Sequence, residues 1–324
     1  MRRGGPLMRI ALLDDYFNAA RDLADWSQLD GRADITVFTE PLGGEENAAK
    51  VLADFEIIVG MRERTPFPGT LIRRLPKLKL LITTGMRNRS FDLEAAHAQG
   101  ITVCGTEGGS GPGSASELAV GLMITLMRDI HGQFDSMRQG GWQTRPGYGL
   151  AGKTLGLLGL GKLGGAVAAV GNAFNMKVIA WSQNLTDQRA AECNARRVKK
   201  DELFRQSDVL SIHLILSDRT RGIVGARELG MMAPTAYLIN TSRGPIVDEV
   251  ALLKALQEKR IAGAALDVYS VEPLPADHLI RRLDNVLLTP HIGYVTAENL
   301  AEWYPDAVED IVAFLEGRPI RVLK

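Results

Sequence analysis

The sequence predicts an α/β protein with two domains, each built on a doubly wound parallel sheet. The chain has 324 residues, more than the roughly 100 to 200 of a single ordinary domain. Short apolar runs alternate with segments of helical length along the chain. This alternation is typical of buried parallel strands that crossover helices connect.

Four apolar runs in the first 105 residues, each closed by Gly, Thr or Asp, predict the first sheet. They are MRIALLDD (8–15), EIIVG (56–60), KLLITT (79–84) and ITVCG (101–105). Six more runs after residue 150 predict the second sheet. They are TLGLLG (154–159), KVIAW (177–181), DVLSIHL (208–214), AYLIN (236–240), GAALDV (263–268) and NVLLTP (285–290).

Two helical segments complete the predicted organisation. Residues 114–130 are apolar nearly all round, so we expect a buried helix between domains or subunits, capped by Ser114 or Ser116. Residues 296–317 predict a pair of helices that ends at Gly317. If these helices return to the first sheet, the first domain is discontinuous.

Composition excludes several classes of function. The chain carries 38 basic and 38 acidic residues, so it lacks the positive field of a nucleic-acid-binding protein. Cys104 and Cys193 show no CxxC spacing, which predicts neither a disulfide framework nor a metal site and favours a reducing cytoplasm. The first apolar run ends at Asp14, too early for an export signal, and no run is long enough to cross a membrane. We therefore expect a cytoplasmic protein whose first strand begins at Met8.

A glycine motif follows the first strand of the second sheet. The stretch LLGLGKLGGAV places Gly159, Gly161 and Gly164 in a GxGxxG pattern, between a strand and a helix. Such a turn, here with Lys162 and Leu163, brings backbone amides and a helix N-terminus close to a pyrophosphate. The pattern predicts a Rossmann-type domain that binds NAD or NADP. A small-residue helix start without a ligand is the alternative.

Arg243, Glu272 and His291 each follow the carboxyl end of a strand in the second sheet, and His213 lies at the end of another. Ligands of open α/β sheets bind at this edge. Each residue alone has a plainer explanation, namely an ion pair, a solvated loop acid or a structural histidine. Together they suit carbonyl reduction, because His transfers protons near neutrality, a carboxylate favours its imidazolium, and Arg binds a carboxylate or developing alkoxide.

Five stretches occur in order between residues 153 and 294: GKTLGLLGLGKLG, DVLSIHLILSDRTRGIVG, LINTSRGPIVDEVALLKAL, GAALDVYSVEPLP and LLTPHIG. They resemble the D-isomer-specific 2-hydroxyacid dehydrogenase family. The resemblance implies a Rossmann-type dinucleotide-binding domain (107–295) inserted into a discontinuous, flavodoxin-like substrate domain (1–106 and 296–324). It also implies a cleft between the domains and a homodimer.

The same resemblance implies roles for the residues of the dinucleotide domain. Arg243 would bind the substrate carboxylate and carbonyl, His291 would donate and accept the proton, and Glu272 would pair with His291. Asp267 matches the position that holds the nicotinamide amide. The stretches that line the cofactor contain Thr220 and Thr241.

In the first domain, the stretch TTGMRNRSFD (83–92) is similar to the family's substrate loop. Backbone amides of that loop receive the substrate carboxylate, which would place Gly85 and Met86 at the site. Arg87 and Arg89 stand where a second glycine and an acid are common. Arg87 therefore either binds a substrate carboxylate or is an exposed cation.

The end of the strand VIAW bears on the coenzyme preference. An acidic residue is usual there, because it binds both ribose hydroxyls and repels the 2′-phosphate of NADP. This chain has Ser182, Gln183 and Asn184 instead, and the nearest following cation is Arg189. We expect NADP(H) to be accepted alongside NAD(H), although the sequence supplies no clear clamp for the phosphate.

The sequence thus predicts an NAD(P)-dependent 2-hydroxyacid dehydrogenase, or 2-oxo acid reductase, that acts on a small-molecule acid. Three alternatives use the same fold. One is a phosphoglycerate dehydrogenase-type enzyme in which Arg87 and Arg89 meet a phosphate, the second is a corepressor that senses NAD(H), and the third is a relic that only binds the coenzyme. The full set of Arg, Glu and His favours an enzyme, and neither nucleic acid nor a membrane is expected as a partner.

Overall fold

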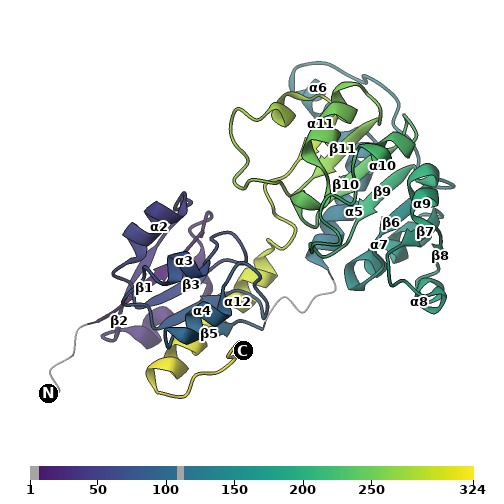
Figure 1. Ribbon diagram of the computed structural model, residues 1–324. Helices are drawn as coiled ribbons and strands as arrows, with labels where there is room; N and C mark the ends of the chain where they lie inside the picture. Colours follow the sequence, from purple (N-terminus) through teal and green to yellow (C-terminus); the bar gives the residue numbers. More distant parts are fainter. Residues whose placement is uncertain (1–6, 108–112) are drawn as a thin grey trace, which may run out of the picture. The chain divides into compact units, whose positions relative to one another are not determined.

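The computed structural model describes residues 7–107 and 113–324, which form two compact units (Figure 1). The first unit combines the residues up to Glu107 with Val295–Lys324, and the second runs from Gly113 to Tyr294. The first unit is discontinuous because the second is inserted between its two pieces of chain. Each unit contains an all-parallel sheet with helices between its strands, so the predicted α/β class is confirmed.

The sheet of the first unit has five strands in the order β2-β1-β3-β4-β5, which is the flavodoxin-like order. The four predicted strands are present. The sequence did not single out β2, because this edge strand alternates apolar and polar residues and forms no continuous apolar run. The elements before the insertion are β1 (Met8–Leu12), α1 (Ala20–Leu23), η1 (Trp26–Leu29), β2 (Ala33–Val37), α2 (Glu45–Leu52), β3 (Ile57–Gly60), α3 (Gly69–Ile72), β4 (Leu80–Thr83), α4 (Leu93–Ala98) and β5 (Thr102–Gly105).

After the insertion, the chain forms one long helix, α12 (Ala297–Leu315), and the predicted pair of helices is wrong. Pro305 lies inside α12 and removes one backbone hydrogen bond. The helix continues through it because α12 packs on α1, η1 and β4 and buries apolar side chains such as Trp303 and Ala307. Gly317 then adopts a left-handed conformation, with φ 77°, just beyond the helix end.

The C-terminal residues cover the edge of the first sheet. The Leu323 amide donates to the Val103 carbonyl at 2.8 Å, alongside β5. Arg321 anchors this segment to α12, because its Nε donates to Asp310 Oδ1 at 3.0 Å and its Nη1 to Glu309 Oε2 at 3.0 Å. Asp310 is fully buried, and burial raises its pKa to about 7 although Arg321 acts in the opposite direction.

The sheet of the second unit has seven strands in the order β12-β11-β10-β9-β6-β7-β8. The order reverses between β6 and β9, and ligands of doubly wound sheets bind at the carboxyl edge beside such a switch point. The six predicted strands are present, and the two exposed residues of β8 were too few to predict. The elements are α5 (Ser114–Met127), α6 (Ile130–Arg138), β6 (Thr154–Leu158), α7 (Lys162–Ala173), β7 (Lys177–Trp181), α8 (Asp187–Glu192), β8 (Arg196–Arg197), α9 (Lys200–Gln206), β9 (Val209–Ile212), α10 (Ala226–Met231), β10 (Tyr237–Asn240), η2 (Gly244–Ile246), α11 (Glu249–Gln257), β11 (Gly263–Leu266), η3 (Leu279–Arg282) and β12 (Val286–Leu288).

The segment expected as one buried helix forms two. α5 ends at Met127, and Asp129, with φ 52°, precedes α6. The expected caps are also wrong: Gly113 is the N-cap, and the Ser116 hydroxyl donates to the Gly113 carbonyl at 3.0 Å. One face of α5 packs on α7, β10 and β11, whereas none of the residues of α6 is buried.

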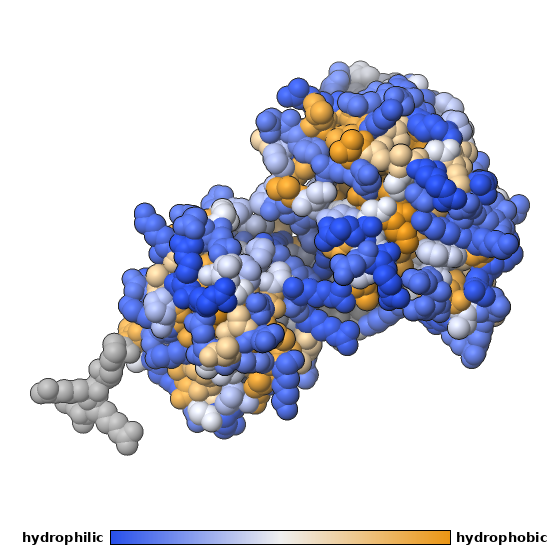
Figure 2. Space-filling model, viewed as in Figure 1, coloured by the Kyte–Doolittle hydropathy of each residue, from blue (hydrophilic) through white to orange (hydrophobic). Residues whose placement is uncertain are grey.

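The view in Figure 2 shows a largely hydrophilic surface on which apolar residues form separate patches. None of the helices in the described part of the chain combines the length and apolar composition needed to cross a membrane. The longest, α12, has 19 residues and contains several acidic ones.

We expect Arg321→Ala to lower the free energy of unfolding of the first unit by about 3 kcal/mol, because it leaves the buried Asp310 carboxylate without its cation. Arg318→Ala is the matched control, since the exposed Arg318 side chain pairs with the nearby Glu316 and such pairs contribute little. Urea denaturation, combined with hydrogen exchange of the α12 amides, measures both variants. Equal stability of the two variants would contradict the expectation.

Candidate active site

In the glycine turn between β6 and α7, backbone segments lie so close together that two positions have no room for a side chain. Gly159 has φ 106°, and a Cβ there would lie 2.6 Å from the carbonyl oxygen of His213. A Cβ at Gly164 would lie 2.2 Å from the Gly159 oxygen, so both positions require glycine. A Cβ at Gly161, in contrast, would meet no described atom within 4 Å. The turn therefore leaves room beside Gly161 at the N-terminus of α7, where a pyrophosphate fits.

The end of β7 lies beside this glycine turn. The Gly159 amide donates to the Trp181 carbonyl at 2.9 Å, which places the following residue, Ser182, next to the turn. The exposed side chains of Lys162 and Leu163 occupy the first turn of α7.

His213 follows β9 and is neutral at neutral pH. Its Nε2 lies 2.9 Å from the Ser211 hydroxyl, and burial lowers its pKa to about 4. Its backbone carbonyl faces Gly159, as described above. His213 therefore shapes the glycine turn without adding a charge to it.

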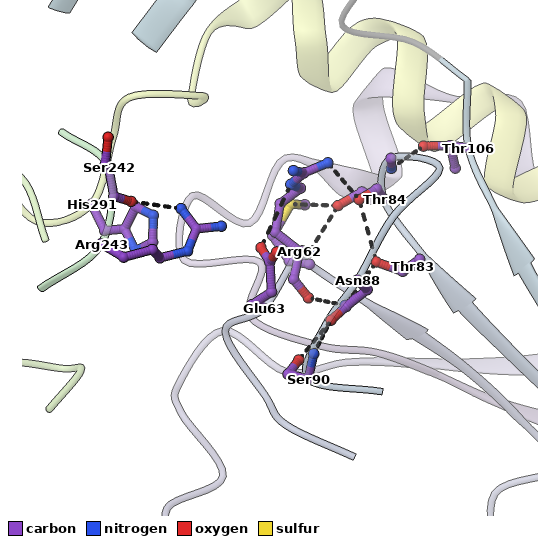
Figure 3. A network of polar contacts seen from close by, with 12 residues as sticks. Arg62, Glu63, Thr83, Thr84, Asn88, Ser90, Thr106, Ser242, Arg243 and His291 are labelled. Carbon is purple, nitrogen blue, oxygen red and sulfur yellow. Dashed lines mark hydrogen bonds and ion pairs between the residues drawn. The ribbon is translucent and has the colours of Figure 1, made fainter. Parts of the chain in front are cut away.

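The loop after β10 fixes Arg243. Buried Asn240 donates through Nδ2 to the Arg243 carbonyl and accepts from the Ser242 amide, both at 3.0 Å. Arg243 Nη1 donates to the Ser242 carbonyl at 2.7 Å (Figure 3). The next residue, Gly244, packs so closely on Tyr269 that a Cβ would lie 2.1 Å from its carbonyl carbon. This packing brings Arg243 to the loop that carries Glu272.

His291 and Glu272 form a hydrogen-bonded pair, with 2.5 Å between His291 Nδ1 and Glu272 Oε2. Glu272 Oε1 accepts from the Tyr269 amide at 2.8 Å. Burial alone would raise the pKa of Glu272, but His291, the Tyr269 amide and Arg243 together hold this pKa below its ordinary value. Glu272 is therefore ionised near neutrality and binds the histidine ring through Nδ1, which leaves Nε2 for a substrate.

The carboxylate of Asp267 holds the loop that carries His291. Oδ1 accepts from the Thr289 hydroxyl at 2.7 Å and from the Ile292 amide at 2.8 Å, and Oδ2 accepts from the Gly293 amide at 2.8 Å. Asp267 is completely buried, and burial raises its pKa although these bonds oppose the change. A carboxylate has about four lone-pair sites, so the loop takes most of them. The predicted contact of Asp267 with a nicotinamide amide stays a prediction.

The two threonines predicted to line the cofactor follow other strands of this edge. The Thr220 hydroxyl donates to the Ile215 carbonyl at 2.7 Å and accepts from the Ser217 amide at 2.8 Å, so it shapes the loop after β9. Thr241 directly follows β10 and is partly exposed. Contact of either residue with a coenzyme stays a prediction.

The predicted substrate loop follows β4 in the first unit. The Gly85 amide already donates to the Thr106 hydroxyl at 2.8 Å. The Met86 amide has no acceptor among the described residues, and the side chains of Met86 and Arg87 are exposed. Of the two predicted amides, Met86 is therefore the one available to a carboxylate.

Sequence reasoning did not single out Arg62, which lies at this same loop. Its amide donates to the Thr84 hydroxyl at 2.9 Å and its Nη1 to the Thr84 carbonyl at 3.2 Å (Figure 3). A Cβ on Gly85 would fall 1.8 Å from Nη1, so the guanidinium covers that glycine. The ring of Trp303 lies 5.8 Å away. The available signal was an arginine just past the carboxyl end of a buried strand.

Residues 120–293 match the sequence model of the D-isomer specific 2-hydroxyacid dehydrogenase, NAD binding domain. This match covers more than half of the chain. The chain belongs to the D-isomer specific 2-hydroxyacid dehydrogenase family. The predicted family is confirmed, and with it an NAD-binding oxidoreductase that interconverts 2-hydroxy acids and 2-oxo acids.

Individual members of the 2-hydroxyacid dehydrogenase family resemble much of the chain. The glyoxylate reductase of Aeropyrum pernix is 38% identical over 76% of this chain and 76% of its own length. The D-3-phosphoglycerate dehydrogenase of Synechocystis is 34% identical over 86% of this chain but only 50% of its own length. The crystal structure of a phosphoglycerate oxidoreductase from Vibrio cholerae matches with a TM-score of 0.90 and 36% identity, over 96% of this chain and 100% of that one.

The lowered pKa of His213 predicts that stability falls on acidification. Between its ordinary pKa of 6.5 and about 4, the unfolded chain binds a proton that the folded chain excludes, so the free energy of unfolding decreases as the pH falls through this window. From about pH 7 to about pH 5 the loss from this residue is about 2 kcal/mol. His213→Gln should lack this part of the decrease in urea denaturation. An identical pH dependence in the variant would contradict the buried neutral histidine.

Proposed function

We propose that the protein is an NAD(P)-dependent oxidoreductase that interconverts a D-2-hydroxy acid and a 2-oxo acid, with His291 as proton donor and acceptor. The observation that supports this most strongly is the His291–Glu272 pair, at 2.5 Å, which Asp267 anchors through the loop after β12. This pair lies at the carboxyl edge of the sheet that carries the glycine turn. Doubly wound sheets bind coenzyme and substrate at that edge.

When bound, the coenzyme would supply or accept the hydride at the substrate carbon. Because Glu272 binds Nδ1 of His291, Nε2 is the atom that exchanges a proton with the substrate oxygen. In reduction the imidazolium gives its Nε2 proton to the carbonyl oxygen as that oxygen becomes a hydroxyl, and in oxidation neutral Nε2 accepts the hydroxyl proton. The Glu272 carboxylate stabilises the imidazolium and keeps the ring oriented.

Arg243 suits the electrostatic part of the reaction. A guanidinium offers N–H donors in a planar fork that matches a carboxylate or a carbonyl oxygen that gains negative charge. One of its donors holds the Ser242 carbonyl, which fixes the orientation of the group. We assign Arg243 to the carboxylate and carbonyl of the substrate.

In the first unit, we assign the substrate carboxylate to the Met86 amide, with Arg62 and Arg87 as nearby cations. The glycine turn of the second unit, with Gly159, Gly161 and Gly164, holds the coenzyme pyrophosphate in this proposal. The coenzyme contacts of Lys162, Leu163, Ser182, His213, Thr220, Thr241 and Asp267 belong to the same proposal.

A phosphorylated substrate is a second candidate, because Arg87 and Arg89 lie on the loop after β4, and Arg62 from the loop after β3 covers Gly85. Two relatives with this chemistry in their names, from Synechocystis and Vibrio cholerae, resemble the chain. Comparison of 3-phosphohydroxypyruvate with hydroxypyruvate separates the candidates, since they differ only in the phosphate. Preference for the phosphorylated acid that disappears in Arg62→Ala would support the second candidate.

The predicted homodimer also stays a proposal. Helix α6 exposes Ile130, Phe134 and Met137 along one side, at 48%, 58% and 53% of their surface. An apolar helix face of this kind is better suited to a subunit contact than the partly buried α5.

We expect His291→Ala to reduce kcat/KM for 2-oxo acids by about 10²- to 10⁴-fold, since it removes the proton donor. Loss of nicotinamide absorbance with glyoxylate, hydroxypyruvate, pyruvate and larger 2-oxo acids measures the effect. His278→Ala is the matched control, because His278 pairs with Glu249 at 3.1 Å outside the proposed site. Equal activity of His291→Ala and wild type would refute the assignment. Tight coenzyme binding without turnover of any acid would favour the sensing corepressor.

We expect the enzyme to use both NADPH and NADH, because Ser182 offers neither the attraction for ribose hydroxyls nor the repulsion of a 2′-phosphate that an acid provides. The ratio of kcat/KM values for the two coenzymes, measured with one 2-oxo acid, tests this. A preference for NADH above ~100-fold, about 2.7 kcal/mol, would count against it.

A further inference from the structure

Arg189 lies against the glycine turn, although 28 residues separate it from Gly161. Its Nε donates to the Leu160 carbonyl at 3.1 Å and its Nη2 to the Gly161 carbonyl at 3.3 Å. Its Nη1 donates to Glu192 Oε2, one turn further along α8, at 3.1 Å. A guanidinium has five N–H donors, and these bonds use three of them. The fold therefore supplies the cation that is missing from the sequence immediately after β7.

This position is next to the end of the coenzyme where NAD and NADP differ. In a Rossmann-type sheet the adenosine ribose lies at the carboxyl end of the second strand, here β7. Ser182 follows β7, and the backbone of Trp181 is bonded to the glycine turn. The guanidinium of Arg189 is thus bonded to the turn residues next to the expected ribose position. Position 182 is a serine, so no acid there opposes a 2′-phosphate.

A hollow of about 410 Å³ opens between α7 and α8 beside this guanidinium. It begins at Lys162 in the first turn of α7, and its polar lining also includes Asn172, Arg189, Glu192 and Asn194. Lys162 and Arg189 are its two cations. Glu192 is the acid in the lining, and its side chain is 49% exposed, so its bond to Arg189 contributes little and a phosphate with nearly two charges can replace it.

We propose that Arg189, together with Lys162, forms the binding site for the 2′-phosphate of NADP(H). Arg189 supplies a planar fork for two phosphate oxygens, and Lys162 adds a point charge. This proposal rests on the use of NADP(H) proposed above, and it names the residues that determine it.

The test is isothermal titration of the full-length protein with 2′,5′-ADP and with 5′-AMP, which differ only in the 2′-phosphate. We expect wild type to bind 2′,5′-ADP at least about tenfold more tightly than 5′-AMP, and Arg189→Ala to reduce this preference to less than about threefold. Lys162→Ala should reduce this preference by a smaller factor, and Glu192→Gln should tighten the binding of 2′,5′-ADP but not that of 5′-AMP. Arg197→Ala is the matched control, because Arg197 is an exposed arginine of β8 that pairs with Asp187.

Two results would overturn the proposal: no preference for 2′,5′-ADP in wild type, or equal weakening of both nucleotides in Arg189→Ala. The second would mean that Arg189 only shapes the turn. If Arg189→Ala binds neither nucleotide, the Glu192→Gln variant decides the question, because it keeps the bonds of Arg189 to the turn. In that variant the binding of 2′,5′-ADP must become tighter while the binding of 5′-AMP stays the same. Nucleotide binding is measured without a 2-oxo acid, so failure of the dehydrogenase reaction would leave this result interpretable.

Discussion

The candidate active edge of the second unit depends on one buried carboxylate. Asp267 ends up with no exposed surface, and its charge is tolerated because the Thr289 hydroxyl and two amides of the following residues bond to it. These bonds tie the end of β11 to the loop after β12. Tyr269 reinforces the link, since its hydroxyl lies 3.0 Å from the Leu266 carbonyl and 2.8 Å from the Thr289 carbonyl. The position of His291 follows from this link.

The loops at both candidate edges hold a side chain on a backbone that non-glycine residues seldom adopt. His291 has φ 53° and Arg62 has φ 52°, and such conformations cost free energy that the surrounding structure must offset. For His291 the bonds of Asp267 to the next two amides provide this support. For Arg62 the Thr84 hydroxyl and the Asn88 side chain hold the amide and the carbonyl. Each of the two residues lies in a loop that follows a strand, β12 for His291 and β3 for Arg62.

Charge is distributed differently at the two ends of the proposed coenzyme site. Beside His291, the Glu272 carboxylate has a pKa held below its ordinary value by His291, the Tyr269 amide and Arg243, although burial acts in the opposite direction. At the glycine turn, His213 is kept neutral by burial, and the cations there are Lys162 and Arg189. A neutral turn with two flanking cations is compatible with a coenzyme that carries an additional phosphate, whereas an acid at position 182 would oppose it.

Most of the fold and many of the candidate residues could be predicted from the sequence, because both depend on local patterns. Apolar runs bounded by Gly, Thr or Asp located the buried strands, and the spacing of Gly159, Gly161 and Gly164 located the turn. Arg243, Glu272 and His291 stood out because each follows a strand. Edge strand β2 lacked such a run, and the predicted pair of helices proved to be the single helix α12, which continues through Pro305 because it is buried.

Only the tertiary structure could decide which distant groups meet. The sequence shows Arg189 after Ser182 as a cation on another helix, but folding of α8 against α7 places it on the glycine turn. The structure alone shows that the Asp267 carboxylate bonds to the loop of His291 and that the Gly85 amide donates to the Thr106 hydroxyl. These outcomes depend on hydrogen bonds between residues far apart in the chain, and such contacts leave no periodic pattern in the sequence.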